Sequence, residues 1–111
     1  MISSGALQAH HSFAADYDIN KPVRLEGVIE EFAFVNPHAE IYIRVNGSRW
    51  WIEAPSPHVL ERRGITKLSV PDGARVTIEG FQAKNGSNKA IGRAMLLPDG
   101  RKIFLDASRA E

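Results

Sequence analysis

The sequence predicts an all-β domain, an OB-like antiparallel barrel of five to six strands with one short helix between strands 3 and 4. Three observations support this: alternating apolar and polar segments recur along the chain, turn signals separate them, and a single stretch carries helix boundary signals. A bent opening strand, a hairpin and a helix before the fourth strand follow the order of an OB-type barrel. A small antiparallel sandwich is the alternative.

The first predicted strand is long and spans Val23–Phe34. Its alternation slips phase at Gly27 and again at Glu30-Glu31, which indicates a bend at a glycine or at a bulge. Pro37 ends the strand region, because proline has no N–H to donate to a ladder.

The second and third strands are predicted at Ile41–Val45 and Trp50–Glu53. Asn46-Gly47 between them favours a tight hairpin turn with positive φ. Alternation places the isoleucines and the valine of the second strand on one face, and Tyr42 and Arg44 on the other.

A short helix is predicted after the third strand, with Ser56 as N-cap, Pro57 as the first helical residue and Gly64 as a left-handed C-cap. The remaining predicted strands are separated by turns at residues 85–88 and 98–100. These strands are Arg75–Phe81, Ala90–Leu97 and Lys102–Leu105.

The length of 111 residues suits one domain with a single core. We predict a flexible N-terminal segment at 1–18, a barrel domain at 19–107 and a tail at 108–111. The small residues up to Ala9 fit the end of a signal peptide, with a plain disordered terminus as the alternative.

Composition excludes several functional classes. Fourteen basic side chains nearly balance thirteen acidic ones, so nucleic acid is not a predicted partner. No apolar run approaches the roughly 20 residues of a membrane span. The absence of cysteine excludes disulfides, thiolate zinc sites and thiol catalysis, so any metal would be held by nitrogen and oxygen donors.

The candidate metal ligands are the four histidines, His10, His11, His38 and His58. Cleavage after Ala9 would give His10 a free amine beside its imidazole. Neutral imidazole suits transition metals, and the Irving–Williams order with no thiolate favours copper over zinc. The spacing offers no preassembled chelate, so the site requires convergence in the fold. Structural roles for His38 in a turn and for His58 near a helix cap are the alternative.

Trp50-Trp51 provides a second candidate site. Neighbours on a strand face opposite sides, so one indole enters the core and the other points outward. An outward Trp51 beside Tyr42 and Arg44 would form a platform for a partner protein or a small ligand. In the alternative, the outward indole packs under the N-terminal segment, against Phe13 or Tyr17, or covers a mouth of the barrel.

We predict that the protein is not an enzyme. Its carboxylates are spread over strand faces and turns, and no pairing at catalytic separation follows from their spacing. The chain carries no G-x-S-x-G sequence, no phosphate-cradling glycine loop and no nucleotide fingerprint.

The sequence carries several short motifs, namely His10–Ala15, Asp18, Asn36–His38, Ser56–His58, Arg62–Gly64 and Asp99–Arg101. Together they resemble an uncharacterised family of small exported bacterial proteins, domain of unknown function 6152. The resemblance implies a cleaved signal peptide and a periplasmic or secreted location, and it supplies no activity. Glu40 stands where the family often has an aromatic residue, which adds a carboxylate close to His38.

The functional prediction is a small periplasmic binding module that holds or passes on a transition-metal ion, with copper favoured, through its histidines. The alternatives are a metal-free domain that binds a partner protein or small ligand on the aromatic strand face, and a structural envelope protein. The predicted partners are a metal ion or another envelope protein, and the oligomeric state stays open.

Overall fold

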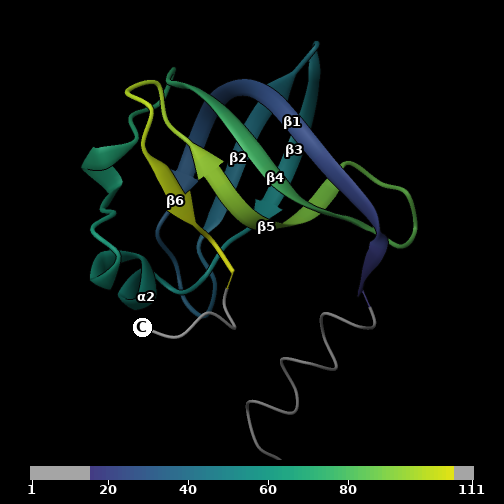
Figure 1. Ribbon diagram of the computed structural model, residues 1–111, viewed down its shortest axis with the longest axis horizontal. Helices are drawn as coiled ribbons and strands as arrows, with labels where there is room; N and C mark the ends of the chain where they lie inside the picture. The colour runs from purple at the N-terminus through teal and green to yellow at the C-terminus, as the bar shows by residue number, and fades with distance from the viewer. Residues whose placement is uncertain (1–15, 107–111) are drawn as a thin grey trace, which may run out of the picture.

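The computed structural model describes residues 16–106 and shows a β-rich chain with one short α-helix in that range (Figure 1). The prediction of an all-β class with a short helix is confirmed. A 3-10 helix, η1 (Lys67–Ser69), was not predicted. The elements in order are β1 (Tyr17–Ala33), β2 (Glu40–Val45), β3 (Ser48–Glu53), α2 (Pro57–Arg62), η1, β4 (Arg75–Ala83), β5 (Lys89–Leu96) and β6 (Lys102–Phe104).

The strands form one sheet in the order β3-β2-β1-β4-β5-β6, and β3 also pairs with β5. The first five strands therefore close into a ring. Neighbours in the order are antiparallel, whereas the closing β3–β5 pairing is parallel over Trp51–Glu53. The parallel pairing follows from the strand order, because the four antiparallel pairings from β3 to β5 reverse the direction four times and so leave β5 parallel to β3.

The long strand β1 bends where the sequence indicates. Its pairing with β2 shifts register between Ile29 and Glu31, so Glu30 is the extra residue of a bulge. At Gly27 the strands approach so closely that an added Cβ would lie 2.5 Å from the carbonyl oxygen of Arg44. The bulge and the glycine thus both contribute to the bend.

β1 begins at Tyr17 rather than at the predicted Val23, so the boundary placed at residue 18 falls within the strand. Tyr17 is buried, whereas residues 19–22 are exposed and carry no alternation that would signal a strand. Because these residues are exposed on both faces of the strand, they do not alternate between apolar and polar, and the sequence pattern does not identify them as a strand.

The two best-defined local predictions concern the hairpin and the helix. Asn46 and Gly47 both have positive φ, at 50° and 83°, as a tight turn of this kind requires. In α2 the Ser56 hydroxyl accepts a hydrogen bond from the Val59 N–H at 3.3 Å. The helix ends at Arg62, and its C-cap is Arg63 rather than the predicted Gly64. Gly64 follows the cap and has the predicted left-handed conformation, with a φ of 85°.

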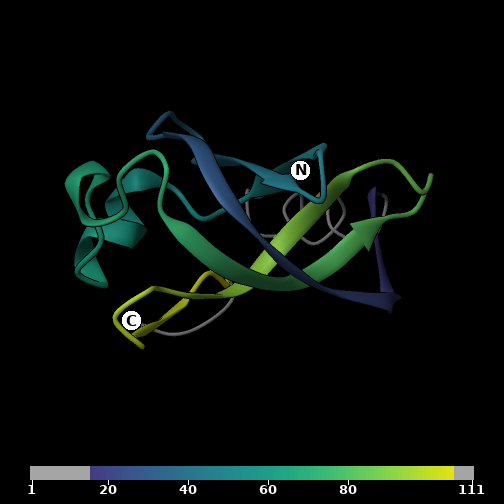
Figure 2. The same cartoon turned by 90° about the horizontal axis from the view of Figure 1, so that it is seen from above.

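The core fills the ring, and α2 lies at one end of the long axis while the β4–β5 loop lies at the other (Figure 2). Leu60 is the buried residue of α2 and joins the core cluster. Within the described range, no helix has the length and apolar character that crossing a membrane requires.

Candidate functional site

The outward face of the β2–β3 hairpin carries three pairs of side chains in register. The two-residue turn fixes Val45 opposite Ser48, and successive outward positions then pair. The inward side chains between them, such as Ile41 and Ile43, are fully buried. We call the six outward residues the ladder, and its rungs are Arg44 with Arg49, Tyr42 with Trp51, and Glu40 with Glu53.

The ladder has a basic end and an acidic end with an aromatic rung between them. Four residues separate the end rungs along each strand, a span of about 14 Å at roughly 3.4 Å per residue. The fold therefore displays an ordered series of charges on one surface.

At the basic end, two guanidinium groups share one carboxylate. Glu30, the bulge residue of β1, forms ion pairs with both arginines. Its carboxylate oxygens lie 2.6 Å from the Arg44 Nε and 3.0 Å from the Arg49 Nε. Arg44 also donates to the Gly47 carbonyl at 3.0 Å. The bulge thus directs Glu30 to a place where it orders both arginines but balances only one positive charge.

At the aromatic rung, a cation lies over each ring. The Arg49 guanidinium carbon is 4.4 Å from the Tyr42 ring centroid, and the Lys89 Nζ is 4.2 Å from that of Trp51. Lys89 comes from β5, where it is the register partner of Trp51, and it also lies 5.6 Å from the Tyr17 ring. The Trp51 Nε1 is buried without a hydrogen-bond partner among residues 16–106.

At the acidic end, each carboxylate accepts a hydrogen bond from a tyrosine hydroxyl. Tyr17 donates to Glu53 Oε1 at 2.8 Å, and Tyr42 donates to Glu40 Oε1 at 2.7 Å. Burial, followed by the Glu53 hydrogen bond, raises the pKa of Tyr17 well above its ordinary 10.0. The Glu40 hydrogen bond is the main cause that raises the pKa of Tyr42. Both phenols therefore stay neutral donors at physiological pH.

The three residues predicted for the aromatic face, Tyr42, Arg44 and Trp51, are brought together on neighbouring rungs. Trp50 packs against the core from the other face, as alternation predicts. Trp51 shares Lys89 with Tyr17, so the N-terminal start of β1 does lie beside the outward indole. Phe13, the other predicted neighbour, lies outside the described residues.

The histidines do not form a metal centre in the described part of the chain. His38 lies with its Nε2 3.7 Å from Glu53 Oε2, at the acidic end of the ladder. His58 lies on α2, with its Nε2 3.4 Å from the Arg62 guanidinium. Residues 16–106 contain no group of three or more His, Asp or Glu side chains placed to hold a metal ion. His10 and His11 fall outside that range, so the four-histidine site stays a prediction.

Sequence reasoning missed several residues of this face. Arg49 and Glu53 follow from the two-residue turn, since the turn alone fixes the register of the hairpin. Lys89 had no local signal, because the pairing of β3 with β5 joins distant parts of the chain. The phase slip at residues 30–31 located the bulge but gave no indication that Glu30 binds two arginines.

Comparison with known proteins gives a family and a fold. Residues 1–93 match a family of unknown function, DUF6152. No curated protein matches the chain. A solved structure that resembles it is the crystal structure of the TiaS-tRNA(Ile2)-ATP complex, with 18% sequence identity and a TM-score of 0.54. The match covers 68% of this chain and 18% of that chain, and it supports similarity of fold alone.

Proposed function

Because this chain belongs to DUF6152, a family of unknown function, we propose its role from its geometry: a small binding module whose ladder takes an extended segment of a partner protein. The ring closed by β3 and β5 supports an OB-type assignment, in which the faces of strands 2 and 3 and the flanking loops bind ligands. His38 lies in the loop before β2, and Lys89 directly follows the β4–β5 loop.

The observation that carries the proposal is the order of charges along the ladder. Same-side residues of an extended peptide recur every two positions, at about the 6.8 Å spacing of the rungs. A peptide with an acidic residue at position i, an apolar one at i+2 and a basic one at i+4 would therefore match all three rungs. Its acidic residue would meet Arg44 and Arg49, and its basic residue would meet Glu40 and Glu53.

The charge balance of the face favours a peptide over a polyanion. Its three cations, Arg44, Arg49 and Lys89, are accompanied by four carboxylates. These are Glu30 and Glu31 of β1, where Glu31 is the register partner of Tyr42, together with Glu40 and Glu53. The phosphates of a nucleic acid would be attracted by the arginines of the basic rung and repelled by the carboxylates of the acidic rung. Flat stacking of a sugar or base would first displace the cations over Tyr42 and Trp51, at about 0.5–1 kcal/mol each.

The test uses two peptides of equal composition and amide-shift titrations. Ser-Glu-Ser-Phe-Ser-Lys-Ser carries the matching order, and Ser-Glu-Ser-Lys-Ser-Phe-Ser exchanges the last two functional residues. We expect the matching peptide to bind more tightly and to shift the amides of β2 and β3. Equal affinity for the two peptides would contradict the proposal.

A matched pair of variants localises the effect. Glu40→Gln combined with Glu53→Gln removes the negative charge but keeps an oxygen for each tyrosine hydroxyl. At about 0.5 kcal/mol for each of the two partly exposed charge pairs that are lost, affinity for the matching peptide falls about fivefold. Glu26→Gln, at an exposed position of β1 outside the ladder, should leave affinity unchanged.

One observation favours metal binding as a second candidate function. The Tyr17–Glu53 hydrogen bond holds the start of β1 at the end of the ladder where His38 lies. His11 precedes Tyr17 by six residues, which reach at most about 20 Å when extended. Copper, and less favourably zinc, held by His10 or His11 together with His38 is therefore compatible with this attachment point.

Titration of a chain that starts at His10 with Cu²⁺ and Zn²⁺ tests this candidate. Paramagnetic broadening, or zinc-dependent shifts, of the His38 ring together with those of His10 or His11 would support a shared site. Metal effects confined to His10 and His11, and unchanged in His38→Ala, would refute it. The extracytoplasmic location and the structural envelope role stay predictions.

A further inference from the structure

A second surface feature lies on β1, β4 and β5 and shares no residue with the ladder. It is an open groove of about 340 Å³. Pro22 and Phe81 supply apolar walls, Gly80 lies between them, and Arg24, Glu79 and Arg93 bring charge. The geometry points to a binding site for a small carboxylate carried on an apolar body.

The groove owes its shape to a bulge in β5. Glu79 pairs with Ala94 and Gly80 pairs with Gly92, so Arg93 has no residue opposite it. At Gly80 the two backbones approach so closely that an added Cβ would lie 2.1 Å from the Ile91 carbonyl oxygen. Bulges redirect side chains and are common beside functional sites. Here the bulge leaves Arg93 exposed, 6.0 Å from the Phe81 ring centroid.

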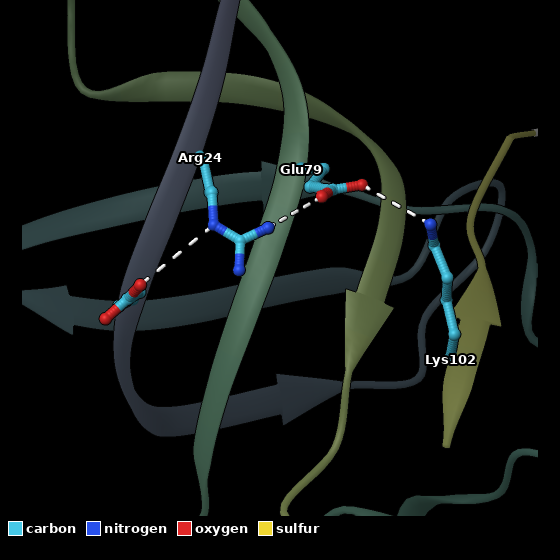
Figure 3. Close-up of polar contacts among 4 residues, drawn as sticks. Arg24, Glu79 and Lys102 are labelled. Carbon is cyan, nitrogen blue, oxygen red and sulfur yellow. Dashed lines mark hydrogen bonds and ion pairs between the residues drawn. The ribbon is translucent and has the colours of Figure 1, made fainter. Parts of the chain in front are cut away.

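The charges on this surface leave one cation without a carboxylate. Figure 3 shows Glu79 between Arg24 and Lys102, in contact with both. Arg24 Nη1 lies 2.8 Å from Glu79 Oε2, and Lys102 Nζ lies 3.7 Å from Glu79 Oε1. Arg24 Nε is also 4.0 Å from Glu26 Oε2. No acidic side chain among residues 16–106 forms an ion pair with Arg93. In and beside the groove, the cations Arg24, Arg93 and Lys102 thus accompany the carboxylates Glu26 and Glu79, and Arg93 is the cation that lacks an ion pair within the described part of the chain.

These features select the chemical class of the ligand. A volume near 340 Å³ is at the lower end of the range of about 300–1,000 Å³ for small-molecule sites. A guanidinium binds a carboxylate through two parallel hydrogen bonds, while Pro22 and Phe81 would contact the apolar body. A single excess positive charge matches a monoanion, whereas a phosphate dianion would place an uncompensated charge close to Glu79.

The test compares 3-phenylpropanoate with 3-phenylpropanamide, which has the same shape and no charge. Amide-shift titration of the full chain should move the resonances of Gly80, Phe81, Gly92 and Arg93. We expect the carboxylate to bind about fivefold more tightly than the amide, the upper range for a partly exposed ion pair. Equal affinities, or shifts centred on the ladder, would overturn the inference.

Two variants separate the site from general charge attraction. Arg93→Gln should abolish the preference for the carboxylate over the amide. Arg75→Gln removes an exposed arginine from the same face of β4 and should preserve the preference. Retention of the preference in Arg93→Gln, or its loss in Arg75→Gln, would show that a specific contact with Arg93 does not exist.

Discussion

The Tyr17–Glu53 hydrogen bond attaches the start of β1 to the ladder, and Tyr17→Phe removes only its hydroxyl. The bond is 2.8 Å long and its acceptor is a carboxylate whose side chain is 20% exposed. Hydrogen bonds to charged groups contribute about 1.5–3 kcal/mol, and partial rehydration of Glu53 places this one at the lower end. We therefore expect Tyr17→Phe to lower the free energy of unfolding by about 1.5 kcal/mol at pH 8.

The same pair predicts a pH dependence of definite sign. The folded pKa of Tyr17 is raised far above the ordinary 10.0, so above pH 10 the unfolded chain loses the phenol proton while the folded chain keeps it. Stability is unaffected below pH 10 and falls as pH rises beyond it. At pH 11 the loss is about 1.4 kcal/mol, from RT ln(1 + 10) for one proton.

Phenylalanine at position 17 lacks this ionisation, so the difference between the two proteins should nearly vanish at pH 11. Urea unfolding of both proteins at pH 8 and pH 11, followed by circular dichroism, measures that difference. Other titrating groups are common to both chains and cancel. A difference of about 1.5 kcal/mol that persists at pH 11 would refute the reasoning, because it would mean that Tyr17 ionises equally in both states.

Two further substitutions test the fold. Gly27→Ala places a Cβ 2.5 Å from the Arg44 carbonyl oxygen, so we expect a loss of about 1–3 kcal/mol in urea unfolding, and an unchanged midpoint would contradict the close approach. Leu60→Ala empties a fully buried position of α2 and should cost about 2–5 kcal/mol, whereas Leu68→Ala, at a position 91% exposed, should change stability by less than about 0.5 kcal/mol. Similar losses for the two leucines would show that α2 does not contribute to the core.

Features set by neighbouring residues could be predicted from the sequence. Asn46-Gly47 requires a tight turn, and the turn then determines which side chains oppose each other across the hairpin. Ser56 and Pro57 define the start of α2 through a local hydrogen bond and a fixed φ. The alternation of side chains along a strand likewise predicts that Tyr42 and Trp51 point outward on one face.

Features that depend on chain closure could not be predicted. Lys89 reaches Trp51 only because β5 returns beside β3, and the bulge at Arg93 forms only once β4 and β5 are in register. The early start of β1 was hidden because residues 19–22 are exposed on both faces. Whether distant histidines lie close together also depends on how the chain folds, so their spacing in the sequence does not predict it. In the described range, His38 contacts Glu53 and His58 contacts Arg62.

The most direct test of the ladder is an exchange of charges between protein and peptide. Glu40→Lys reverses the charge of one residue of the acidic rung, and Ser-Glu-Ser-Phe-Ser-Glu-Ser reverses the matching position of the peptide. We predict that the variant binds the original peptide more weakly than the unaltered protein does. The reversed peptide should bind more tightly than the original peptide to the variant, and more weakly than the original peptide to the unaltered protein. Equal binding of both peptides by both proteins would contradict recognition by the order of charges on β2 and β3.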